Sequence, residues 1–283
     1  MKIALIVNLN KKGAFETGEK IATLLLKEGV QVLFHKGRLA DLFSDCQSFD
    51  SRNDLVKESD IVLTVGGDGT IIHTAKYAVK YAKPILGVNL GRLGYVAELE
   101  ADEVDMISRL VKGDFDTCLR SVLSVSIRND RGYFKEYIAI NDAVVSRGSL
   151  SRIIDLQVSI DGDDVSSYRA DGIIVATPTG STAYALSAGG PVISPHLKCI
   201  ELVPVCPHSL SARSVILSED SVIRISASSP DDTSYLTIDG QISEPVNEDE
   251  VVEIKNSQST LEMIVFKKRN FFKLAGEKLR EVN

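Results

Sequence analysis

The sequence predicts two domains, an N-terminal α/β domain with a parallel sheet and a C-terminal domain that is mostly antiparallel β. A chain of 283 residues has the length of about two domains. Over the first hundred residues, apolar runs alternate with helical patterns. From about Ser121, short segments rich in Val, Ile, Ser and Thr follow one another with only turns between them. We place the domains at residues 1–115 and 116–267, and expect the tail 268–283 to pack back on the first.

The elements of the first domain follow from its apolar periodicity. Lys2–Val7 is a continuous apolar run, and Ile21, Leu24 and Leu25 form one stripe of a helix. Strands that alternate with helices imply right-handed βαβ units. The stretch from His35 to Asp54 has no clean period, and we expect a mobile excursion with at most one helical turn. The predicted strands are Lys2–Val7, Val30–Phe34, Asp60–Val65 and Pro84–Val88, and the predicted helices are Ala14–Lys27, Ile71–Tyr81 and Asp102–Val111.

The second domain is predicted from regularly spaced strands. Turn signals such as Asp161-Gly162 and Asp239-Gly240 separate them. The tail Phe271–Val282 can form a short helix. The predicted strands are Val122–Ile127, Tyr133–Ile140, Ile153–Ile160, Val222–Ile225, Tyr235–Ile238, Val251–Ile254 and Leu261–Phe266.

Composition excludes several classes of protein. The chain is 44% hydrophobic and 25% charged, which is typical of a soluble globular protein. Its net charge of −7 argues against a nucleic-acid or anionic-membrane partner. The apolar run Ile3–Val7 is too short for a signal peptide, and no run has the roughly 18 residues of a membrane helix, so we expect a cytoplasmic protein. The four cysteines have neither CxxC nor zinc-site spacing and are expected to be reduced thiols.

The sharpest local feature is the turn Gly66-Gly67-Asp68-Gly69-Thr70, which joins the strand ending at Val65 to a helix. Glycines let a ligand approach the backbone amides, and a helix N-terminus favours a phosphate. The turn is not a Walker A loop, because no lysine follows its last glycine. An acid among phosphates requires a reason, either a bound Mg²⁺ or the removal of a proton from an attacking hydroxyl. The alternative is a tight turn in which Asp68 caps the helix.

Two further segments strengthen the nucleotide interpretation. Gly87–Tyr95 is a second glycine loop after the next strand, and Thr177–Tyr184 carries five hydroxyls. Ligands of open α/β sheets bind beyond the carboxyl ends of the strands, so the two glycine loops are expected to face one crevice. A connecting turn in which Tyr95 covers the core is the alternative for the second loop.

Taken together, these segments closely resemble the NAD kinase family. The resemblance runs in order from Ile3 to about Phe266, and the short N-terminus is similar to the bacterial form. The first motif is shared with diacylglycerol-kinase-like and phosphofructokinase-like enzymes, so a Rossmann-like N-terminal domain of that kind is implied, whereas the hydroxyl-rich element is highly specific. The matching segments are Gly66–Thr70, Asn89–Tyr95, Asn141-Asp142, Asp171-Gly172, Thr177–Tyr184, Pro207–Arg213 and Asp239–Gln241.

The resemblance implies transfer of the γ-phosphoryl of ATP, or of polyphosphate, to the 2′-hydroxyl of the adenosine ribose of NAD, giving NADP. Asp68 matches the proposed general base, while Gly66, Gly67, Gly69 and Thr70 would bind phosphate. The transition state needs charge neutralisation, so Mg²⁺ bound through the phosphates is expected. A homodimer or homotetramer is also implied.

The resemblance further implies a set of NAD contacts. Asp142 stands where the family has Glu, and its shorter side chain leaves its role open. A plain β-turn is the alternative for Asn141-Asp142, and a hairpin turn is the alternative for Gln241. The implied contacts are Asp68, Gly69, Asn141, Asp142, Arg152, Arg169, Asp171, Thr182, Ala183, Tyr184, Ala185, Leu186, Ser187, Cys206 and Gln241.

Three other activities compete with this interpretation. A lipid or sphingoid-base kinase of the same superfamily would need a wide apolar pocket and a membrane-facing surface. A non-catalytic NAD(P) sensor would gain nothing from an acid beside phosphates, which argues against it because Asp68 is present. A hydrolase that removes the 2′-phosphate would release phosphate from NADP alone.

Overall fold

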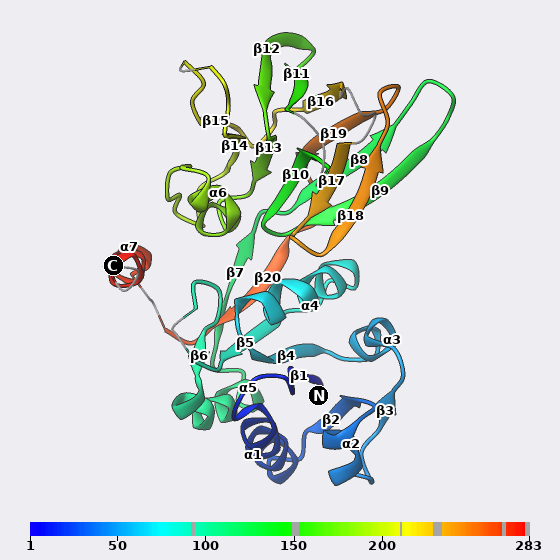
Figure 1. Cartoon of the computed structure of the whole chain (residues 1–283). Helices are drawn as coiled ribbons and strands as arrows, with labels where there is room; N and C mark the ends of the chain where they lie inside the picture. Colours follow the sequence, from blue (N-terminus) through cyan, green and yellow to red (C-terminus); the bar gives the residue numbers. More distant parts are fainter. Residues whose placement is uncertain (92–93, 149–152, 210, 229–233, 268–269, 281–283) are drawn as a thin grey trace. The chain divides into compact units, whose positions relative to one another are not determined.

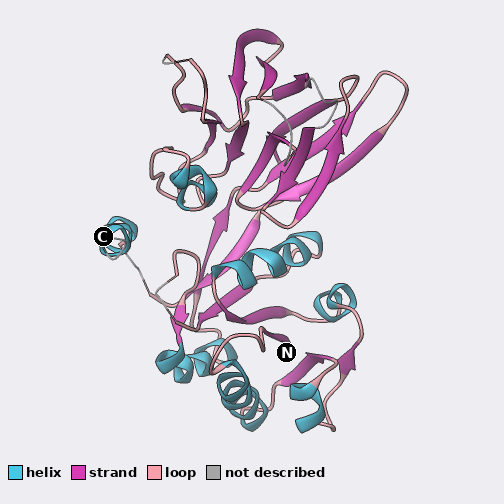
Figure 2. Cartoon of the chain, in the orientation of Figure 1, coloured by secondary structure: helices cyan, strands magenta, loops and turns pink. Residues whose placement is uncertain are grey.

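The structure is a computed structural model of the whole chain (Figure 1), and it describes residues 1–91, 94–148, 153–209, 211–228, 234–267 and 270–280. The chain forms two compact units, Met1–Arg120 together with Ser259–Asn283, and Ser121–Gln258. Most helices belong to the first unit, and the second is built almost entirely of strands (Figure 2). The α/β and antiparallel β architectures expected from the sequence are confirmed.

The first unit is built on one largely parallel sheet. The strand order is β3-β2-β1-β4-β5-β20-β7, and β6 pairs with β5. All of these pairs are parallel except β20 with β7. The strands are β1 (Lys2–Val7), β2 (Gln31–His35), β3 (Ser48–Phe49), β4 (Ile61–Gly66), β5 (Ile85–Asn89), β6 (Leu99–Glu100), β7 (Asp116–Arg120) and β20 (Leu261–Val265).

Helices pack on both faces of this sheet (Figure 1). Ile21 and Leu25 of α1 are buried in the same core cluster as Leu5 of β1 and Leu63 of β4, because the apolar stripe of the helix faces the sheet. The helices are α1 (Ala14–Lys27), α2 (Arg38–Leu42), α3 (Arg52–Lys57), α4 (Asp68–Lys80), the 3₁₀ helix η1 (Ala101–Ile107), α5 (Ser108–Val111) and α7 (Phe271–Arg280).

The segment 35–54 is more ordered than its sequence predicts. The expectation of at most one helical turn is wrong, because the chain forms α2, β3 and the start of α3 there. The side chain of Ser51 accepts a hydrogen bond from the backbone N–H of Asn53 and so caps α3, which buries Leu55 and Val56. These elements have two to six residues, too few to establish a period in the sequence.

Two strands at the domain boundary pair with the first sheet. Asp116–Arg120 and Leu261–Phe266 fall within residues 116–267, which were expected to form the β-rich domain. In the structure β7 and β20 pair antiparallel, with Met263 opposite Cys118, and Met263 also pairs with Ile85 of β5. Apolar patterning predicts a strand at Leu261–Phe266 but does not choose its partner sheet, and it predicts no strand at Asp116–Arg120, which forms β7 in the structure.

The second unit is a sandwich of two six-stranded antiparallel sheets. One has the order β15-β14-β13-β10-β17-β18 and the other β12-β11-β16-β19-β8-β9. Alternate residues of both sheets, such as Val145 and Val125, form one buried cluster. The strands are β8 (Leu123–Arg128), β9 (Phe134–Ala139), β10 (Asp142–Arg147), β11 (Ile154–Ile160), β12 (Asp163–Ala170), β13 (Gly172–Ala176), β14 (Cys199–Val205), β15 (Val215–Ser218), β16 (Ile223–Ser228), β17 (Ser234–Ile238), β18 (Ile242–Val246) and β19 (Val251–Asn256).

A short helical segment covers the outer face of the β10 sheet. It consists of the 3₁₀ turn η2 (Gly180–Thr182) and α6 (Tyr184–Ser187). Ala185 of α6 is buried against Val144 of β10 and Val203 of β14. Antiparallel sheets commonly expose one polar face to water. The outer face of the β10 sheet is instead apolar at this place, and α6 covers it.

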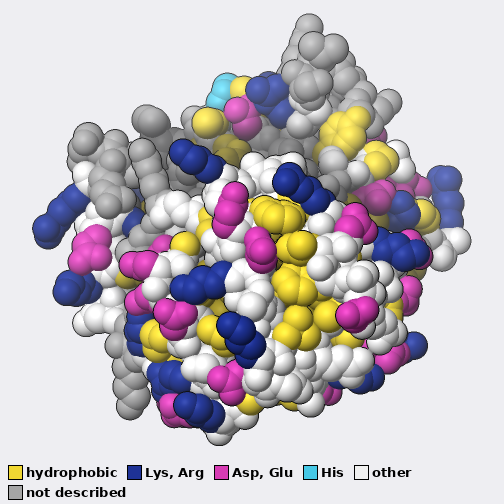
Figure 3. Space-filling view, turned by 90° about the horizontal axis from the view of Figure 1, so that it is seen from below, with side chains coloured by type: hydrophobic (Ala, Val, Ile, Leu, Met, Phe, Trp, Pro, Cys, Tyr) yellow, Lys and Arg dark blue, Asp and Glu magenta, His cyan; other side chains and the backbone are white. Residues whose placement is uncertain are grey.

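The surface carries charges of both signs. On the face seen in Figure 3, the described basic and acidic side chains are interspersed, and neither sign forms a continuous patch. Among the described residues no helix has the length and apolar character that crossing a membrane requires.

Candidate active site

The glycine turn lies at the point where the strand order of the first sheet changes direction. β1 lies between β2 and β4, and β4 runs directly into α4 through the turn. Asn8, just after β1, donates through Nδ2 to Thr70 Oγ1 at 3.1 Å. The N–H of Leu90, just after β5, donates to the carbonyl oxygen of Gly66 at 2.6 Å. The turn is thus held at the carboxyl ends of three strands, where open α/β sheets bind ligands.

The first glycine of the turn is required by close packing, whereas the last leaves the backbone open. A Cβ on Gly66 would lie 2.4 Å from Thr70 Oγ1, so a side chain there would displace the first turn of α4. At Gly69 a Cβ would meet nothing within 4 Å, and the residue is exposed. The first amides of a helix have no partner within the helix, and they carry a partial positive charge. The exposed start of α4 therefore suits a phosphate.

The carboxylate of Asp68 is held by the second glycine loop. Oδ2 accepts the N–H of Tyr95 at 2.7 Å, and Oδ1 accepts the N–H of Val96 at 3.2 Å. A Cβ on Gly94 would lie 2.2 Å from Asp68 Oδ1, so only glycine lets this loop approach. The expectation that the two glycine loops meet is confirmed. Helix capping does not account for the acid, because the cap of α4 is Gly67 and the Asp68 carboxylate accepts amides of another loop.

Tyr95 lies beside this acid and beneath the C-terminal helix. The ammonium group of Lys278 in α7 lies 3.9 Å from the centre of the Tyr95 ring, a cation–π contact. Burial, and after it the charge of Asp68, raises the pKa of the Tyr95 hydroxyl. Tyr95 therefore remains a neutral phenol near neutral pH.

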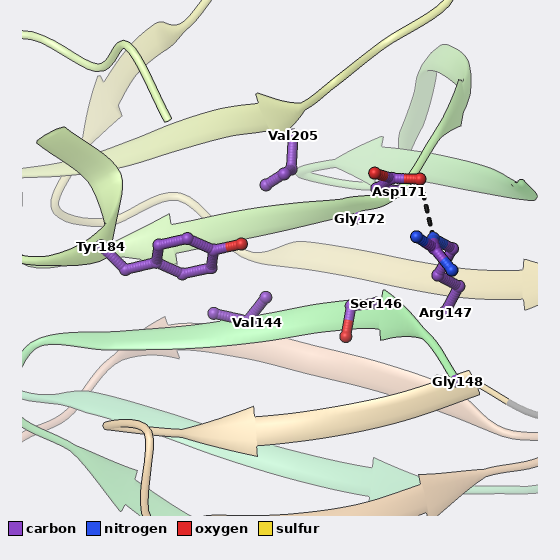
Figure 4. A pocket seen from close by; sticks show the side chains of 8 residues that line it. All are labelled: Val144, Ser146, Arg147, Gly148, Asp171, Gly172, Tyr184 and Val205. Atoms are coloured by element: carbon purple, nitrogen blue, oxygen red, sulfur yellow. Dashed lines mark hydrogen bonds and ion pairs between the residues drawn. The ribbon is translucent and has the colours of Figure 1, made fainter. Parts of the chain in front are cut away.

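The second unit contains a pocket of about 270 Å³ (Figure 4). The Tyr184 ring extends between Val144 and Val205, and its hydroxyl is directed towards Arg147 and Asp171 (Figure 4). The Nε of Arg147 and Oδ1 of Asp171 form an ion pair at 2.8 Å. The pocket therefore combines apolar walls and an aromatic ring with one charged end. Its lining residues are Val144, Ser146, Arg147, Gly148, Asp171, Gly172, Tyr184 and Val205.

Arg147 and Ser146 belong to this pocket, although the sequence analysis did not select them. The signal was available, because alternate residues of a strand face the same side. Asp142, Val144 and Ser146 are alternate residues of β10 and share one face. Once Asp142 is expected to contact a ligand, Ser146 is therefore expected to face the same side of the sheet. The ion pair of Arg147 with Asp171 depends on a neighbouring strand that the sequence does not identify.

Asn141 and Asp142 lie where the chain passes from one sheet of the sandwich to the other. β9 belongs to one sheet and β10 to its neighbour, so the two strands do not form a hairpin, and the alternative of a plain β-turn stays open. Asp142 is only 4% exposed. Burial, with the charge of Asp239 as the second cause, raises the pKa of Asp142 to about 7. This acid therefore titrates near neutral pH.

The hydroxyl-rich element uses most of its hydroxyls to hold its own turn. Thr177 Oγ1 donates to the carbonyl oxygen of Ile140 at 2.7 Å and accepts the N–H of Gly180. Ser181 donates to Pro178, and Thr182 donates to Thr179. These hydroxyls shape the segment that presents Tyr184, whose side chain is half exposed at the pocket. Among the other expected contacts, Ala185 is buried against the sheet, while Ala183 and Leu186 are half-buried and Ser187 is exposed.

The remaining predicted residues do not line the described pocket. Arg169 is exposed on β12, and its carbonyl oxygen accepts the N–H of His208. Cys206 is exposed just beyond Val205. Gln241 closes the β17–β18 hairpin through its N–H to Ile238, which is the alternative foreseen for it. Arg152 lies outside the described residues.

No cluster of three or more His, Cys, Asp or Glu side chains suited to a metal ion occurs among the described residues. The four cysteines are free thiols, as their spacing predicted. Residues 196–208 therefore form no such cluster within the described part of the chain.

The fold and this geometry already define a class. A parallel α/β unit with a glycine turn at its switch point and an acid held beside it is typical of enzymes that bind nucleotide phosphates and transfer phosphoryl groups. Residues 3–115 match the family model of the ATP-NAD kinase N-terminal domain, and residues 140–266 match the model of the C-terminal domain. A NAD kinase of Geotalea daltonii is 35% identical over 280 residues, which cover 99% of this chain and 98% of that protein. The chain therefore belongs to the NAD kinase family.

Solved structures agree with this assignment. The crystal structure of yeast NADH kinase complexed with NADH is 25% identical with a TM-score of 0.89, and the match covers 100% of this chain and 88% of that one. An NAD kinase from Archaeoglobus fulgidus in complex with ATP is 27% identical with a TM-score of 0.75, and both chains are covered fully. The two-unit fold is therefore the fold of kinases that act on nicotinamide dinucleotides.

Proposed function

We propose that this protein transfers the γ-phosphoryl group of ATP to the 2′-hydroxyl of the adenosine ribose of NAD, which yields NADP. The observation that carries the proposal is the Asp68 carboxylate, held by two amides beside a glycine turn, in a chain that matches both domains of the ATP-NAD kinase family. A ligand-binding module has no use for a fixed negative charge beside phosphates. A phosphotransferase uses it on the attacking hydroxyl.

In this proposal the glycine turn and Asp68 serve the transfer step. The exposed amides at the start of α4, with Thr70, bind phosphate oxygens. Each carboxylate oxygen of Asp68 accepts one amide and keeps a further acceptor position, so it can orient the 2′-hydroxyl and take its proton.

The pocket of the second unit and the Asn141-Asp142 segment bind the dinucleotide. Asn141 and Asp142 suit ribose hydroxyls, since an amide and a carboxylate accept hydrogen bonds from them. Tyr184 offers a ring against which a base can stack, and the Arg147–Asp171 pair closes the polar end. Roles for Gly69, Arg152, Arg169, Cys206 and Gln241 remain part of the proposal.

A divalent cation, Mg²⁺, would be bound mainly by the phosphate oxygens of ATP. This fits the donor set, because the described residues offer no three-carboxylate cage and Mg²⁺ often keeps phosphate and water ligands. When bound, it would neutralise charge on the transferred group.

An activity panel tests the proposal. Purified protein with Mg²⁺ is given ATP or polyphosphate as donor, and NAD, NADH or a sphingoid base as acceptor. NADP formed from ATP and NAD is the expected product. Phosphorylation of the sphingoid base alone would favour a lipid-type kinase, and phosphate released from NADP alone would favour a hydrolase.

Native mass under the same conditions tests the proposed homodimer or homotetramer, and fractionation of cells tests the proposed cytoplasmic location.

A further inference from the structure

Asp239 makes an unusual set of contacts with the backbone of the Asn141-Asp142 segment. Its carboxylate accepts three consecutive amides, from Ile140 at 3.0 Å, from Asn141 at 2.7 Å and from Asp142 at 3.1 Å. The N–H of Asp239 in turn donates to the carbonyl oxygen of Asp142 at 3.0 Å. One side chain at the tip of the β17–β18 hairpin therefore fixes the place where the chain changes sheets.

The same segment is held from its other side. The N–H of Thr177 donates to the carbonyl oxygen of Asn141 at 2.8 Å, and the Thr177 hydroxyl donates to the carbonyl oxygen of Ile140. A Cβ on Gly180 would lie 2.0 Å from the carbonyl oxygen of Asn141, so Gly180 packs directly on this backbone. The amides of residues 140–142 face Asp239, and the carbonyl oxygens of Ile140 and Asn141 face Thr177, so this backbone is hydrogen-bonded on both sides.

The backbone of Asp239 is also specialised. Its φ of +49° lies in the left-handed region, where Asp and Asn are tolerated better than most residues. A charge accepting three amides is worth more than a neutral acceptor. The positive φ is what the Asp239-Gly240 hairpin turn requires, whereas the three amide contacts give a separate reason for a charged aspartate at this position.

We propose that Asp239 is a positioning residue for NAD, which fixes the side chains of Asn141 and Asp142 by clamping the three amides of residues 140–142. The proposal rests on the function proposed above, in which Asn141 and Asp142 contact the dinucleotide. Asp239 itself touches no substrate. Its effect passes through the backbone it holds.

The chain contains a matched control in Asp161. This aspartate also has a positive φ, +56°, and is followed by a glycine at a hairpin tip. Its carboxylate accepts the N–H of Val222 at 2.8 Å, and its own N–H donates to the carbonyl oxygen of Val222. Asp161 belongs to the β11–β12 hairpin of the other sheet and does not line the described pocket. Asp161 therefore shares the hairpin position of Asp239 and binds a neighbouring segment, but it accepts one amide and not three.

The test compares Asp239→Asn with Asp161→Asn in the full-length protein. Asparagine retains the size and the tolerance of positive φ, but loses the charge and one acceptor. We expect KM for NAD to rise about tenfold in Asp239→Asn, with KM for ATP and the melting temperature changed no more than in Asp161→Asn. Hydrogen exchange at the amides of residues 140–142 should become faster only in Asp239→Asn, and this readout does not depend on activity.

The pH profile separates positioning from general stability. Asp239 is the charged neighbour that helps to raise the pKa of Asp142, so its removal should move the acid limb of kcat/KM for NAD to lower pH. Faster exchange without a change in KM for NAD would overturn the proposal, as would unchanged exchange. If wild-type protein makes no NADP, the proposed function fails, and the clamp then fails with it as a positioning device even where exchange responds. Should Asp239→Asn not fold, Asp239→Glu, which keeps the charge but moves it, is expected to raise KM for NAD as well.

Discussion

The two units use an aspartate in opposite ways. In the first unit the acid of the site, Asp68, is itself bound by the amides of Tyr95 and Val96 and keeps a defined position at the surface of the glycine turn. In the second unit the amides belong to the site and the clamping acid, Asp239, stands outside it. Asp142 is left buried beside that clamp, with its pKa raised to about 7.

This difference assigns different tasks to the two regions. An acid whose position is fixed by two amide donors suits a group that must meet a hydroxyl in the same geometry in every turnover. A buried acid near its titration point suits binding, because a ligand hydroxyl can replace the water it has lost. Changes in the first region are therefore expected to act on kcat, and changes in the second on the KM for NAD.

The largest effect is expected from Asp68→Asn. The variant keeps an acceptor for one amide but loses the negative charge and the proton acceptor. We expect NAD binding close to normal and turnover lower by roughly a hundredfold or more. Isothermal titration with NAD and a coupled NADP assay measure the two quantities. Normal turnover in this variant would remove the distinction between the two regions, because the first acid would then be structural.

Gly94→Ala probes the same acid without changing it. The new Cβ would lie 2.2 Å from Asp68 Oδ1, and the atom that must yield is the end of a side chain, so Asp68 moves while the fold persists. We expect kcat to fall about tenfold or more, since small displacements of catalytic groups are costly, with the melting temperature almost unchanged.

Gly276→Ala in α7 is the control for Gly94→Ala, because its Cβ would meet nothing within 4 Å. It should leave kcat at the wild-type value. If Gly94→Ala changed the KM for NAD and left kcat unchanged, the two amides that hold Asp68 would serve NAD binding. The expectation that changes in the first region act on kcat would then be wrong.

Asp142→Asn sharpens the description of the second region. Ribose hydroxyls donate best to the ionised carboxylate, so kcat/KM for NAD in the wild type should rise through about pH 7, the pKa of Asp142. The variant should lose several-fold in kcat/KM above pH 8 and little at pH 6, because its amide does not titrate. A pH profile of the variant that still rises through pH 7 would assign that limb to another group.

Local signals in the sequence were sufficient for the glycine turn. The strand, the three glycines and the helix that follows are neighbours in the chain, and the main difference in the structure is that α4 starts at Asp68 instead of Ile71. The meeting of this turn with the loop at Gly94 followed from the topology of parallel sheets, because both follow adjacent strands.

Contacts between distant segments were beyond the sequence. Asp239 lies 97 residues from Asp142, and a hairpin signal at Asp239-Gly240 gives no hint of three amides from another strand. The partner of Arg147 depends in the same way on the order β13-β10, and the sheet chosen by β7 and β20 on pairing rather than pattern. The family resemblance indicated that Asp239–Gln241 matters. It did not indicate why.

A third acid, Glu201, differs from both Asp68 and Asp142. Glu201 lies on β14 in the same cross-strand row as Ala176 and Asp142, is fully buried, and neither of its carboxylate oxygens has a hydrogen-bond partner among the described residues. Burial alone raises its pKa from 4.5 to about 7. It contrasts with Glu253, which is also buried but is paired with both Arg128 and Arg224.

The smallest effect on turnover, and a clear effect on stability, is expected from Glu201→Gln. The folded protein holds this proton up to about pH 7 and the unfolded chain releases it near pH 4.5, so the wild type loses stability as pH rises between these values, by about 3 kcal/mol in total. Glutamine does not titrate, so the free energy of unfolding of the variant, measured with urea, should rise relative to that of the wild type by up to that amount between pH 4 and pH 8.

Glu253→Gln is the control and should instead destabilise the protein by about 1 kcal/mol at neutral pH, because it leaves two arginines without their acid. Opposite signs for the same substitution would show that a buried carboxylate in this unit costs stability unless arginines compensate it, and a Glu201→Gln curve parallel to that of the wild type would contradict this.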